Sequence, residues 1–525
     1  MSQIDRLSIP PDQRVVSVRD WIGFVAMVVG MFMAILDIQI VASSLAQIQA
    51  GISASADEIS WVQTSYLIAE VVMIPLSGWM ARVFSTRWLF FVSATTFTLA
   101  SALCAFAWNI ESMIVMRAIQ GFLGGAMIPT VFATSFILFP PRMSAGISVL
   151  IGLVATMAPT LGPTLGGWLT DMLSWHWLFL INVVPGVMVA LIVLTFVDLD
   201  RPRLHLLAGF DMAGIVLIAL FLGSMQYVLE EGPRADWFDD ASIVLFTGLM
   251  VVAGAAFVWR ELTYEHPVVE LRAFTDRNFL VGCIFSFIIG TGLYGSVYVI
   301  PLFLGRVRGY SSLEIGLTMM VTGLFQFLSA PLAGNLARHM DLRLMLAMGL
   351  GLFGTGLWLN SFLTSEWGYW EMFLPQAVRG LSLMFCMVPI NNVALGHLPP
   401  DKVQNASGLY NLMRNTGGAV GLAAITTAVS HRLDLHMARL SERITEGNLE
   451  AVTRLQNMAA RYADLIPGDP DQAALRALSR MVKQQATTMA YGDVLLCMSL
   501  VFACGLLLMP FVHKVSASGK RAADH

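Results

Sequence analysis

Residues 75–82 read Pro-Leu-Ser-Gly-Trp-Met-Ala-Arg, and residues 331–338 read Pro-Leu-Ala-Gly-Asn-Leu-Ala-Arg. Each copy ends a long apolar run, and in each a further arginine stands five positions later, at Arg87 and Arg343. The copies are 256 residues apart, about half the length of this chain of 525 residues. A repeat at this distance predicts two similar halves that run in the same direction.

The composition indicates that both halves lie in a membrane. Hydrophobic residues make up 56% of the chain and charged residues 13%, whereas soluble domains have about 45–50% and about 25%. One bilayer crossing takes about 20 apolar residues, so the chain has material for about a dozen crossings. These proportions exclude a soluble protein and predict an all-α polytopic membrane protein, because helices satisfy their own backbone hydrogen bonds in lipid.

Apolar windows long enough to cross a bilayer occur fourteen times. They lie near residues 21–46, 59–80, 88–108, 112–137, 145–170, 177–197, 212–230, 242–259, 279–302, 314–336, 344–362, 372–396, 405–429 and 489–512. We expect two six-helix bundles with the seventh and eighth spans as an extra central pair. The expected parts are a tail at 1–20, an N-terminal bundle at 21–197, an insertion at 198–277, a C-terminal bundle at 278–512 and a tail at 513–525.

The basic residues indicate the orientation. With the N-terminus in the cytoplasm, seventeen of the 31 Lys and Arg fall in the tails and short loops of that side, and three fall in short outer loops. Cytoplasmic loops carry such an excess of positive charge. Both termini are therefore expected to be cytoplasmic.

Five charged residues stand inside the predicted spans, where each costs about 2.5–3.5 kcal/mol. They are Asp37, Glu70, Arg117, Arg379 and Arg414. At 1.5 Å per residue, the first acid and the first arginine lie at matching depths, about 24 and about 22 Å from the cytoplasmic ends of their spans. The pair is either a proton-coupling site, in which the arginine tunes the acid, or a permanent structural ion pair.

A further acid, Glu70, falls near the membrane midplane. Helical spacing predicts that it shares a face with Gln63, Tyr66 and Ser77. We expect this stripe to face a cavity and Glu70 to accept protons. Arg379 belongs to a second internal echo, because Gln376-Ala-Val-Arg-Gly380 repeats Arg117-Ala-Ile-Gln-Gly121 with Arg and Gln exchanged. For Arg379 and Arg414, packing and a role in the substrate path both remain open.

The fifth window contains the helix-breaking stretch Gly162-Pro163-Thr164-Leu165-Gly166-Gly167. Small residues permit close helix packing, and proline permits a bend within a membrane helix. The stretch is therefore a candidate conformational element or a passive kink.

Other chemistry is not indicated. The five cysteines all lie in apolar runs, so neither a disulfide framework nor a metal site is expected. None of the four lysines completes a phosphate-binding loop, and no nucleophile–base pair stands at a recognisable spacing. The sequence thus predicts a non-enzyme without catalytic residues, metal or cofactor, and no nucleic-acid partner.

At residues 20–512 the chain resembles the fourteen-span drug:proton antiporters of the major facilitator superfamily, the EmrB/QacA type. The similarity is carried by the antiporter motif in span five (Gly162, Pro163, Gly166, Gly167), the RxxQG motif in span four (Arg117, Gln120, Gly121), the acid Asp37, and the stretches 61–67, 175–182 and 411–418. It implies export of lipophilic, amphipathic compounds across a bacterial inner membrane by alternating access, driven by the proton gradient. We place Gln63, Tyr66, Gln120, Arg379 and Arg414 along the expected cavity or substrate path.

The resemblance further implies a cytoplasmic gate at the two repeated loops. The residues concerned are Gly78, Arg82, Arg87, Gly334, Arg338, Asp341 and Arg343. The chain departs from the family here, because Arg82 replaces the usual aspartate and Ser85 the second glycine. A latch through that aspartate is therefore not expected.

The segment 431–488 is expected to be a long, helical, periplasmic segment. The family resemblance implies that it docks a periplasmic adaptor, which in turn meets an outer-membrane channel; the alternative is a helical cap over the outer mouth. A turn at residues 467–470 should lead into a third helical stretch that ends near Val482. The rival functions are a dedicated exporter of one metabolite, such as a siderophore or a fatty acid, and a non-transporting receptor or scaffold.

Overall fold

The computed structural model describes residues 16–55, 58–209, 211–265, 267–445, 447–463 and 469–513. Most of the predicted tails at 1–20 and 513–525, and positions 467–468 of the predicted turn, lie outside these ranges. The secondary structure within them is entirely helical. The all-α prediction is confirmed.

Helices of the N-terminal part pack into one group. Its long members are α2 (Val18–Ala42), α4 (Trp61–Phe84), α5 (Thr86–Cys104), α6 (Ile110–Leu138), α7 (Ser144–Met172) and α9 (Val183–Phe196). The short helices are α3 (Leu45–Ile52), η2 (Pro141–Met143) and α8 (Trp177–Leu180).

The C-terminal part forms a second group, and two helices lie between the groups in sequence. The second group contains α12 (Arg277–Arg306), α13 (Ser312–His339), α14 (Leu342–Asn360), α15 (Tyr369–Leu395), α16 (Pro400–Ser441), α17 (Leu449–Ala463), α18 (Pro470–Leu506) and η6 (Met509–Phe511). The inserted part contains η3 (Leu204–Gly209), α10 (Met212–Glu231), η4 (Trp237–Asp239), α11 (Ala241–Thr263) and η5 (Leu271–Thr275). Helix α10 packs against α11 and α4 and touches α16.

Thirteen helices in the described ranges are long and apolar enough to cross a membrane. A multi-pass membrane protein is thereby confirmed. The thirteenth predicted window, 405–429, lies in α16, which is not among these helices. Its middle carries Asn411, Arg414 and Asn415, so its hydropathy is low although it packs among the other helices. The number of fourteen spans, and the cytoplasmic location of the termini, stay predictions.

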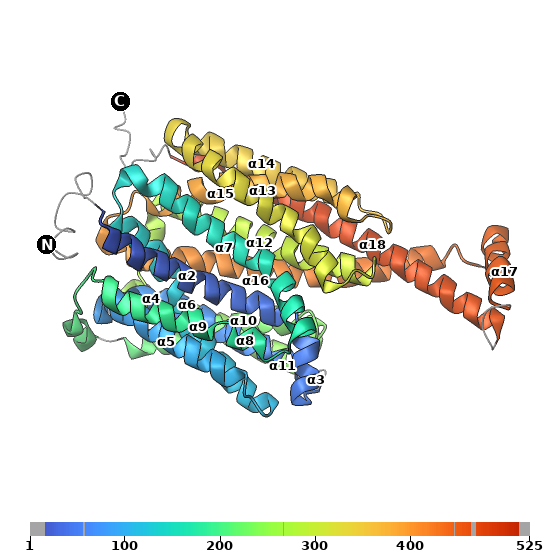
Figure 1. Cartoon of the computed structure of the whole chain (residues 1–525), viewed down its shortest axis with the longest axis horizontal. Helices are drawn as coiled ribbons and strands as arrows, with labels where there is room; N and C mark the ends of the chain where they lie inside the picture. Colours follow the sequence, from blue (N-terminus) through green and yellow to red (C-terminus); the bar gives the residue numbers. More distant parts are fainter. Residues whose placement is uncertain are drawn as a thin grey trace.

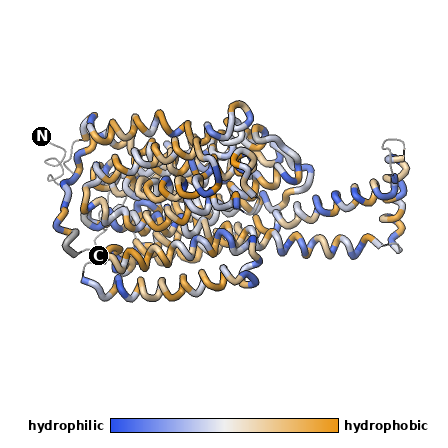
Figure 2. The backbone as a smooth tube through the Cα atoms, turned by 90° about the horizontal axis from the view of Figure 1, so that it is seen from below, coloured by the Kyte–Doolittle hydropathy of each residue, from blue (hydrophilic) through white to orange (hydrophobic). Residues whose placement is uncertain are grey.

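The bundle has two ends, which we name by their features (Figure 1). The tail face is the end where α2 begins at Val18 and α18 finishes at Leu506. The hairpin face is the opposite end, from which α16 and α18 project. Figure 2 shows that the projecting part is more hydrophilic than the bundle.

The segment 431–488 extends away from the bundle as a helical hairpin (Figures 1 and 2). It consists of the end of α16, the crossing helix α17 and the beginning of α18. The prediction of a separate third helix ending near Val482 was wrong, because α18 runs unbroken from Pro470 to Leu506. The hairpin does not fold back over the bundle, so the arrangement differs from a cap.

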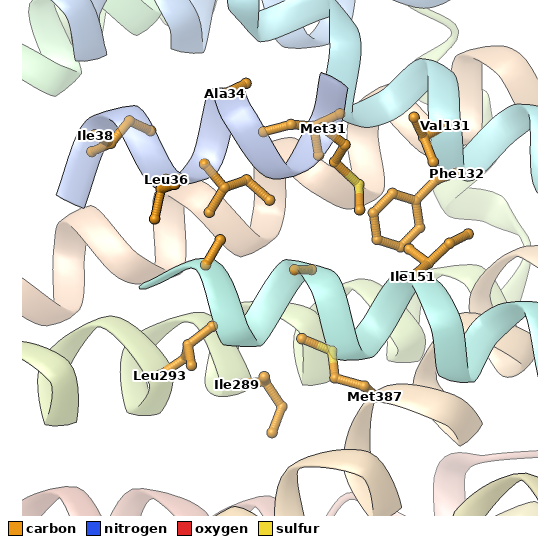
Figure 3. Packing of buried hydrophobic residues seen from close by; sticks show 14 of the residues in the cluster. Met31, Ala34, Leu36, Ile38, Val131, Phe132, Ile151, Ile289, Leu293 and Met387 are labelled. Atoms are coloured by element: carbon orange, nitrogen blue, oxygen red, sulfur yellow. The ribbon is translucent and has the colours of Figure 1, made fainter. Parts of the chain in front are cut away.

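The two groups of helices share one apolar core. Helix α7 packs against α13 and α15, while α4 and α6 pack against α16. Figure 3 shows buried side chains from both groups around α7, among them Phe132, Ile151 and Met387. Burial of these side chains in a shared core stabilises the present conformation.

Close contact at the tail face depends on the two repeated glycines. A Cβ atom on Gly78 of α4 would lie 2.7 Å from the Cα of Asn405 and 2.7 Å from the carbonyl oxygen of Gln404, both in α16. A Cβ on Gly334 of α13 would lie 3.1 Å from the side chain of Val149 in α7. Each copy of the repeat therefore contacts the opposite bundle, and the bundles are closed together at this face.

We predict that Gly78→Ala opens the tail face, because the added methyl group has no space beside the α16 backbone. Overpacking costs about 1–3 kcal/mol, and about 1.4 kcal/mol changes a population tenfold. Maleimide labelling of Ser407→Cys, in a chain lacking Cys497 and Cys504, should become about tenfold faster. Gly351→Ala in α14, where a Cβ meets no atom within 4 Å, is the control; equal labelling rates in both variants would contradict the closure.

Candidate functional site

Asp37 and Arg117 form an ion pair inside the N-terminal bundle. The Arg117 Nη1 group donates a hydrogen bond of 2.5 Å to Asp37 Oδ2, and neither side chain is exposed. The two residues come from α2 and α6, which run in opposite directions. The predicted match in depth thus corresponds to direct contact.

Further hydrogen bonds surround the Asp37 carboxylate. Gln120 Nε2 donates to Asp37 Oδ1 at 3.1 Å, and Asn182 Nδ2 donates to the same oxygen at 2.7 Å. Arg117 also donates to the carbonyl oxygen of Val62 at 3.0 Å and to Gln120 Oε1 at 2.8 Å. Both oxygens of Asp37 are therefore satisfied within the bundle. Asn182 was quoted in the sequence motif 175–182, but its role was missed.

Tyr66 and Gln120 belong to this network and do not line the cavity described below. The Arg117 guanidinium carbon lies 4.2 Å from the centre of the Tyr66 ring, and the Tyr66 hydroxyl donates to the Ala34 carbonyl oxygen at 3.4 Å. Their predicted position on the wall of the cavity is therefore corrected, and a place on the substrate path stays a prediction. Tyr66 lies only about 60° around α4 from Gln63, but its ring packs on Arg117 of α6 and does not line the cavity.

A small cavity lies between the two bundles and the inserted helix α10. Its volume is about 60 Å³. The lining residues come from α2, α4, α10, α12 and α16. They are Ile38, Gln39, Gln63, Leu67, Glu70, Val71, Gln226, Glu230, Tyr294, Asn415, Gly418, Ala419 and Leu422.

Glu70 is the deepest carboxylate of this cavity and differs from Asp37 in its partners. Its side chain is 2% exposed. Its Oε1 atom has no hydrogen-bond partner among the described residues, and no ion pair includes it there. Gln63, two helical turns away on α4, lines the same cavity, but Ser77 lies at the tail face and donates to the Ile74 carbonyl oxygen at 2.6 Å. The predicted stripe therefore holds for Gln63 and Glu70 and is wrong for Ser77.

The two remaining intramembrane arginines are buried and form no ion pair in the described ranges, although the charge of Arg414 attracts the Glu70 carboxylate at longer range. Arg414 donates to Asn411 Oδ1 at 2.6 Å and lies 5.2 Å from the Phe132 ring centre of the opposite bundle. Arg379 donates to Thr322 Oγ1 at 3.1 Å. Neither arginine lines this cavity, although Arg414 neighbours Asn415, which does. The contacts agree with the packing alternative, and a role in the substrate path stays a prediction.

The glycines of the span-five motif pack α7 against α2. A Cβ on Gly162 would collide with Gln39, and one on Gly166 would lie 2.8 Å from the carbonyl oxygen of Ile40. Pro159 and Pro163 lie inside the same helix, and Gly167 is buried. Thr164, within the motif, contacts Gly316 of α13. The motif therefore lies where α7 meets both its own bundle and the opposite one.

The predicted gate loops make polar contacts at the tail face. Arg82 pairs with Glu270 of the inserted part at 3.0 Å, and Arg87 with Asp198 at 3.6 Å. In the second copy, Asp341 caps α14 and lies 3.5 Å from Arg343. Arg338 is exposed; its Nη2 lies 3.9 Å from the Cβ position of Gly146 in α7.

A polar contact at this face was missed from the sequence. Asp200 accepts hydrogen bonds from the Thr86 backbone N–H at 2.9 Å and from Gln404 of the opposite bundle at 3.4 Å. Burial raises the pKa of the Asp200 carboxyl, and the hydrogen bonds from Thr86 oppose this shift. The contact joins residues far apart in the sequence, so no local pattern could reveal it.

We predict that Arg117→Met strongly destabilises the protein, because it leaves the Asp37 charge buried and unpaired at a cost of about 3–5 kcal/mol. Arg82→Met is the control, since its ion pair is partly exposed, with side chains 20% and 37% accessible, and should cost at most about 1 kcal/mol. Thermal denaturation in detergent measures both. The double variant Asp37→Asn/Arg117→Met should recover much of the loss. Equal denaturation midpoints for the two single variants would refute the structural role.

The sequence of this chain is similar to those of known membrane transporters. A family profile described as "Major Facilitator Superfamily" matches residues 27–422. The chain is similar to "Colistin resistance protein EmrB" of Acinetobacter baumannii, with 42% identity covering 94% of this chain and 96% of that protein. It is also similar to "Multidrug export protein EmrB" of Haemophilus influenzae, with 32% identity covering 81% and 83%.

The fold has solved counterparts as well. The structure of the proton:xylose symporter XylE superposes with a TM-score of 0.59 at 12% identity, covering 95% of this chain and 96% of that one. At this identity the likeness concerns the fold alone. The family profile and the two EmrB proteins extend the likeness to the family level, and the predicted resemblance is confirmed. The chain belongs to the Major Facilitator Superfamily, in its EmrB-type branch, and is a membrane transporter rather than an enzyme.

Proposed function

We propose that the protein is a proton-coupled multidrug efflux antiporter of a bacterial inner membrane, working by alternating access without a cofactor. Its substrates are amphipathic, lipophilic compounds that enter from the cytoplasm or the surrounding lipid. Two relatives named for colistin resistance and multidrug export support this substrate class. The proposal depends most on one observation: in the cavity between the bundles, Oε1 of the Glu70 carboxylate has no hydrogen-bond partner among the described residues.

The geometry supports exchange at Glu70. An ionised carboxylate without a hydrogen bond is costly in an apolar setting. A bound proton removes this cost, and so does a bound substrate with a positive or hydrogen-donating group. Proton and substrate therefore compete for one site, which is the requirement of an antiporter. Asp37, by contrast, already has its positive charge and its hydrogen-bond donors.

The present conformation corresponds to one state of the cycle. The tail face is closed by the contacts of Gly78 and Gly334, while the cavity lies toward the ends of α4 and α10 at the hairpin face, near Gln63 and Gln226. A volume of about 60 Å³ is small, because drug-sized ligands occupy about 300 Å³ or more. Substrate binding thus requires the bundles to separate. The α7 motif contacts both bundles and is the element on which they would rock.

The hairpin supports a further part of the proposal, assembly with a periplasmic adaptor and, through it, an outer-membrane channel. The hairpin projects from the bundle on the face opposite the tails (Figure 1). Helix α17 crosses the end of the hairpin and packs against α18, and Leu449 at its start is 79% exposed. An exposed apolar position on a projecting amphipathic helix is suited to a protein partner.

We predict that Glu70→Gln abolishes substrate-dependent proton release from acidified inverted vesicles, because the amide cannot carry the exchanged proton. A panel of lipophilic compounds and a pH-sensitive dye provide the measurement. Asp37→Asn, corrected for the amount of folded protein, should retain release, and Asp239→Asn, an exposed carboxylate at the hairpin face, is the control.

Other outcomes of this experiment separate the alternatives. Release that survives Glu70→Gln but not Asp37→Asn would move the proton site to the ion pair. Release with a single compound of the panel would favour the dedicated exporter. No release with any compound, including candidate metabolites, would favour the receptor or scaffold.

We predict that Leu449→Glu lowers drug resistance in cells but leaves exchange in vesicles unchanged. The added charge disrupts an apolar contact with the adaptor, whereas the bundle that carries out exchange is remote from α17. Drug susceptibility and vesicle assays on the same variant provide the comparison. Unchanged resistance at equal expression would contradict adaptor docking at this position.

A further inference from the structure

The short segment that joins α10 to α11 connects the two bundles at the hairpin face. It runs from Glu231, the last residue of α10, to Trp237, the first residue of η4. We call residues 231–237 the strap. In the sequence it is an ordinary short loop between two spans, and the proposed function gives it no role.

The first end of the strap is fixed to the N-terminal bundle. Thr64 Oγ1, in the first turn of α4, donates a hydrogen bond to Glu231 Oε1 at 3.1 Å. One helical turn earlier on α10, the ring centre of Tyr227 lies 5.7 Å from that of Trp61, at the start of α4. Helix α10 also packs along α4. This end of the strap therefore moves with the N-terminal bundle.

The second end of the strap contacts the C-terminal bundle. Trp237 Nε1 donates to Thr427 Oγ1 of α16 at 2.9 Å, and this hydroxyl donates to the Ala423 carbonyl oxygen at 2.9 Å. A Cβ on Gly232 would lie 2.9 Å from the Trp237 ring, so the indole packs closely on the base of the strap. Thr427 lies five residues, or about 7.5 Å, beyond the cavity residue Leu422 on α16. The contact therefore joins the bundles between the cavity and the hairpin face.

The backbone of the strap is strained where it meets α16. Asp236 and Trp237 have φ angles of 49° and 60°, in the left-handed region that bulky L-residues rarely adopt. The Trp237 backbone N–H donates to the Gly232 carbonyl oxygen at 2.8 Å and holds the turn. Such strain persists only where the surrounding contacts enforce it. Because the strain opposes the contact with α16, that contact breaks at a smaller cost than an unstrained one.

Separation of the bundles would break one of the two ends. Release of an exported substrate requires the bundles to part at the hairpin face, and the strap cannot then keep both contacts. Its first end is held by a helix–helix interface with α4, whereas Trp237 holds α16 from a strained turn. The contact between Trp237 and Thr427 is therefore the one that breaks.

We propose that the strap is a latch of the outer gate. The hydrogen bond from Trp237 to Thr427 holds the bundles together at the hairpin face, and it breaks when the cavity opens to that side. Trp237 is a positioning residue, because it acts on the separation of the bundles and not on the substrate. The inserted helices then take part in the transport cycle. The inference rests on the proposed function, since it takes alternating access as its premise.

The first test measures the separation of the bundles at the hairpin face in the purified full-length protein. Spin labels are attached at Gln47→Cys in α3 and at Glu366→Cys in the loop before α15, in a chain that lacks Cys497 and Cys504. Both labelled positions are exposed. Pulsed electron paramagnetic resonance then gives the distribution of distances between the labels without any need for transport.

Trp237→Phe keeps an aromatic ring but removes the hydrogen-bond donor. The ratio of long to short label distances should rise about two- to tenfold, as expected for one lost hydrogen bond. Trp108→Phe, which changes an exposed tryptophan in the loop between α5 and α6, should keep the wild-type distribution. Thr427→Val removes the acceptor and should give the same shift as Trp237→Phe, and the double variant should add nothing further. Unchanged distances in both single variants, or shifts that add in the double variant, would overturn the inference.

The second test holds the latch closed. Trp237→Cys/Thr427→Cys, in the same background, is joined by a short bis-thiosulfonate reagent applied to cells before inverted vesicles are prepared. The link should stop substrate-dependent proton exchange, and a reducing agent should restore it; each single variant, treated alike, is the control. Exchange that continues in the linked protein would overturn the inference. Failure of the proposed function is distinguishable, because exchange would then be absent before linking, while the label distances would still respond to Trp237→Phe.

Discussion

The cost of a charge without a partner in an apolar bundle governs this structure. The N-terminal bundle contains two buried carboxylates that resolve this cost in different ways. Asp37 is held by Arg117, Gln120 and Asn182, contributed by α6 and the start of α9, so that its charge stabilises the packing of three helices. Glu70 has no ion pair in the described part of the chain, only the longer-range attraction of Arg117 and Arg414, and it faces the other bundle across a cavity. One acid thus stabilises the fold, and the other remains available to exchange its partner.

The two halves of the internal repeat share their helix packing but differ at the position of Glu70. A Cβ on Gly121 would collide with the backbone of Tyr66, and one on Gly380 with the backbone of Thr322, the equivalent residue 256 positions later. The same offset relates Glu70 to Gln326, which donates a hydrogen bond to Thr156 of the opposite bundle. At this position the C-terminal half therefore has an uncharged side chain, Gln326, hydrogen-bonded to the opposite bundle. The N-terminal half has the carboxylate of Glu70 instead. Of these two equivalent positions, only the one on α4 therefore carries a side chain that can bind and release a proton.

The sequence predicted much of this arrangement, and its failures have physical reasons. Rise per residue was sufficient to match Asp37 with Arg117, because the predicted starts of their spans, 21 and 112, lie within three residues of the starts of α2 and α6. The same arithmetic could not decide which side of α4 faces a neighbour, so Tyr66 and Ser77 were placed on the cavity wall in error. Glu230 and the Asp200–Gln404 contact were missed because both depend on helix packing between distant segments. We predicted two separate helices where α18 runs unbroken, because the polar first half of α18 does not resemble the start of a membrane helix.

The most direct test of the account observes the proton on the carboxylate itself. Infrared difference spectroscopy of the purified protein, with and without tetraphenylphosphonium, reports the carbonyl stretch of protonated carboxyl groups. The account predicts that the cation removes one such band in the wild type and in Asp37→Asn, and that Glu70→Gln lacks this change. A band that persists in Glu70→Gln and disappears in Asp37→Asn would contradict the account, because it would place the exchanged proton in the ion pair.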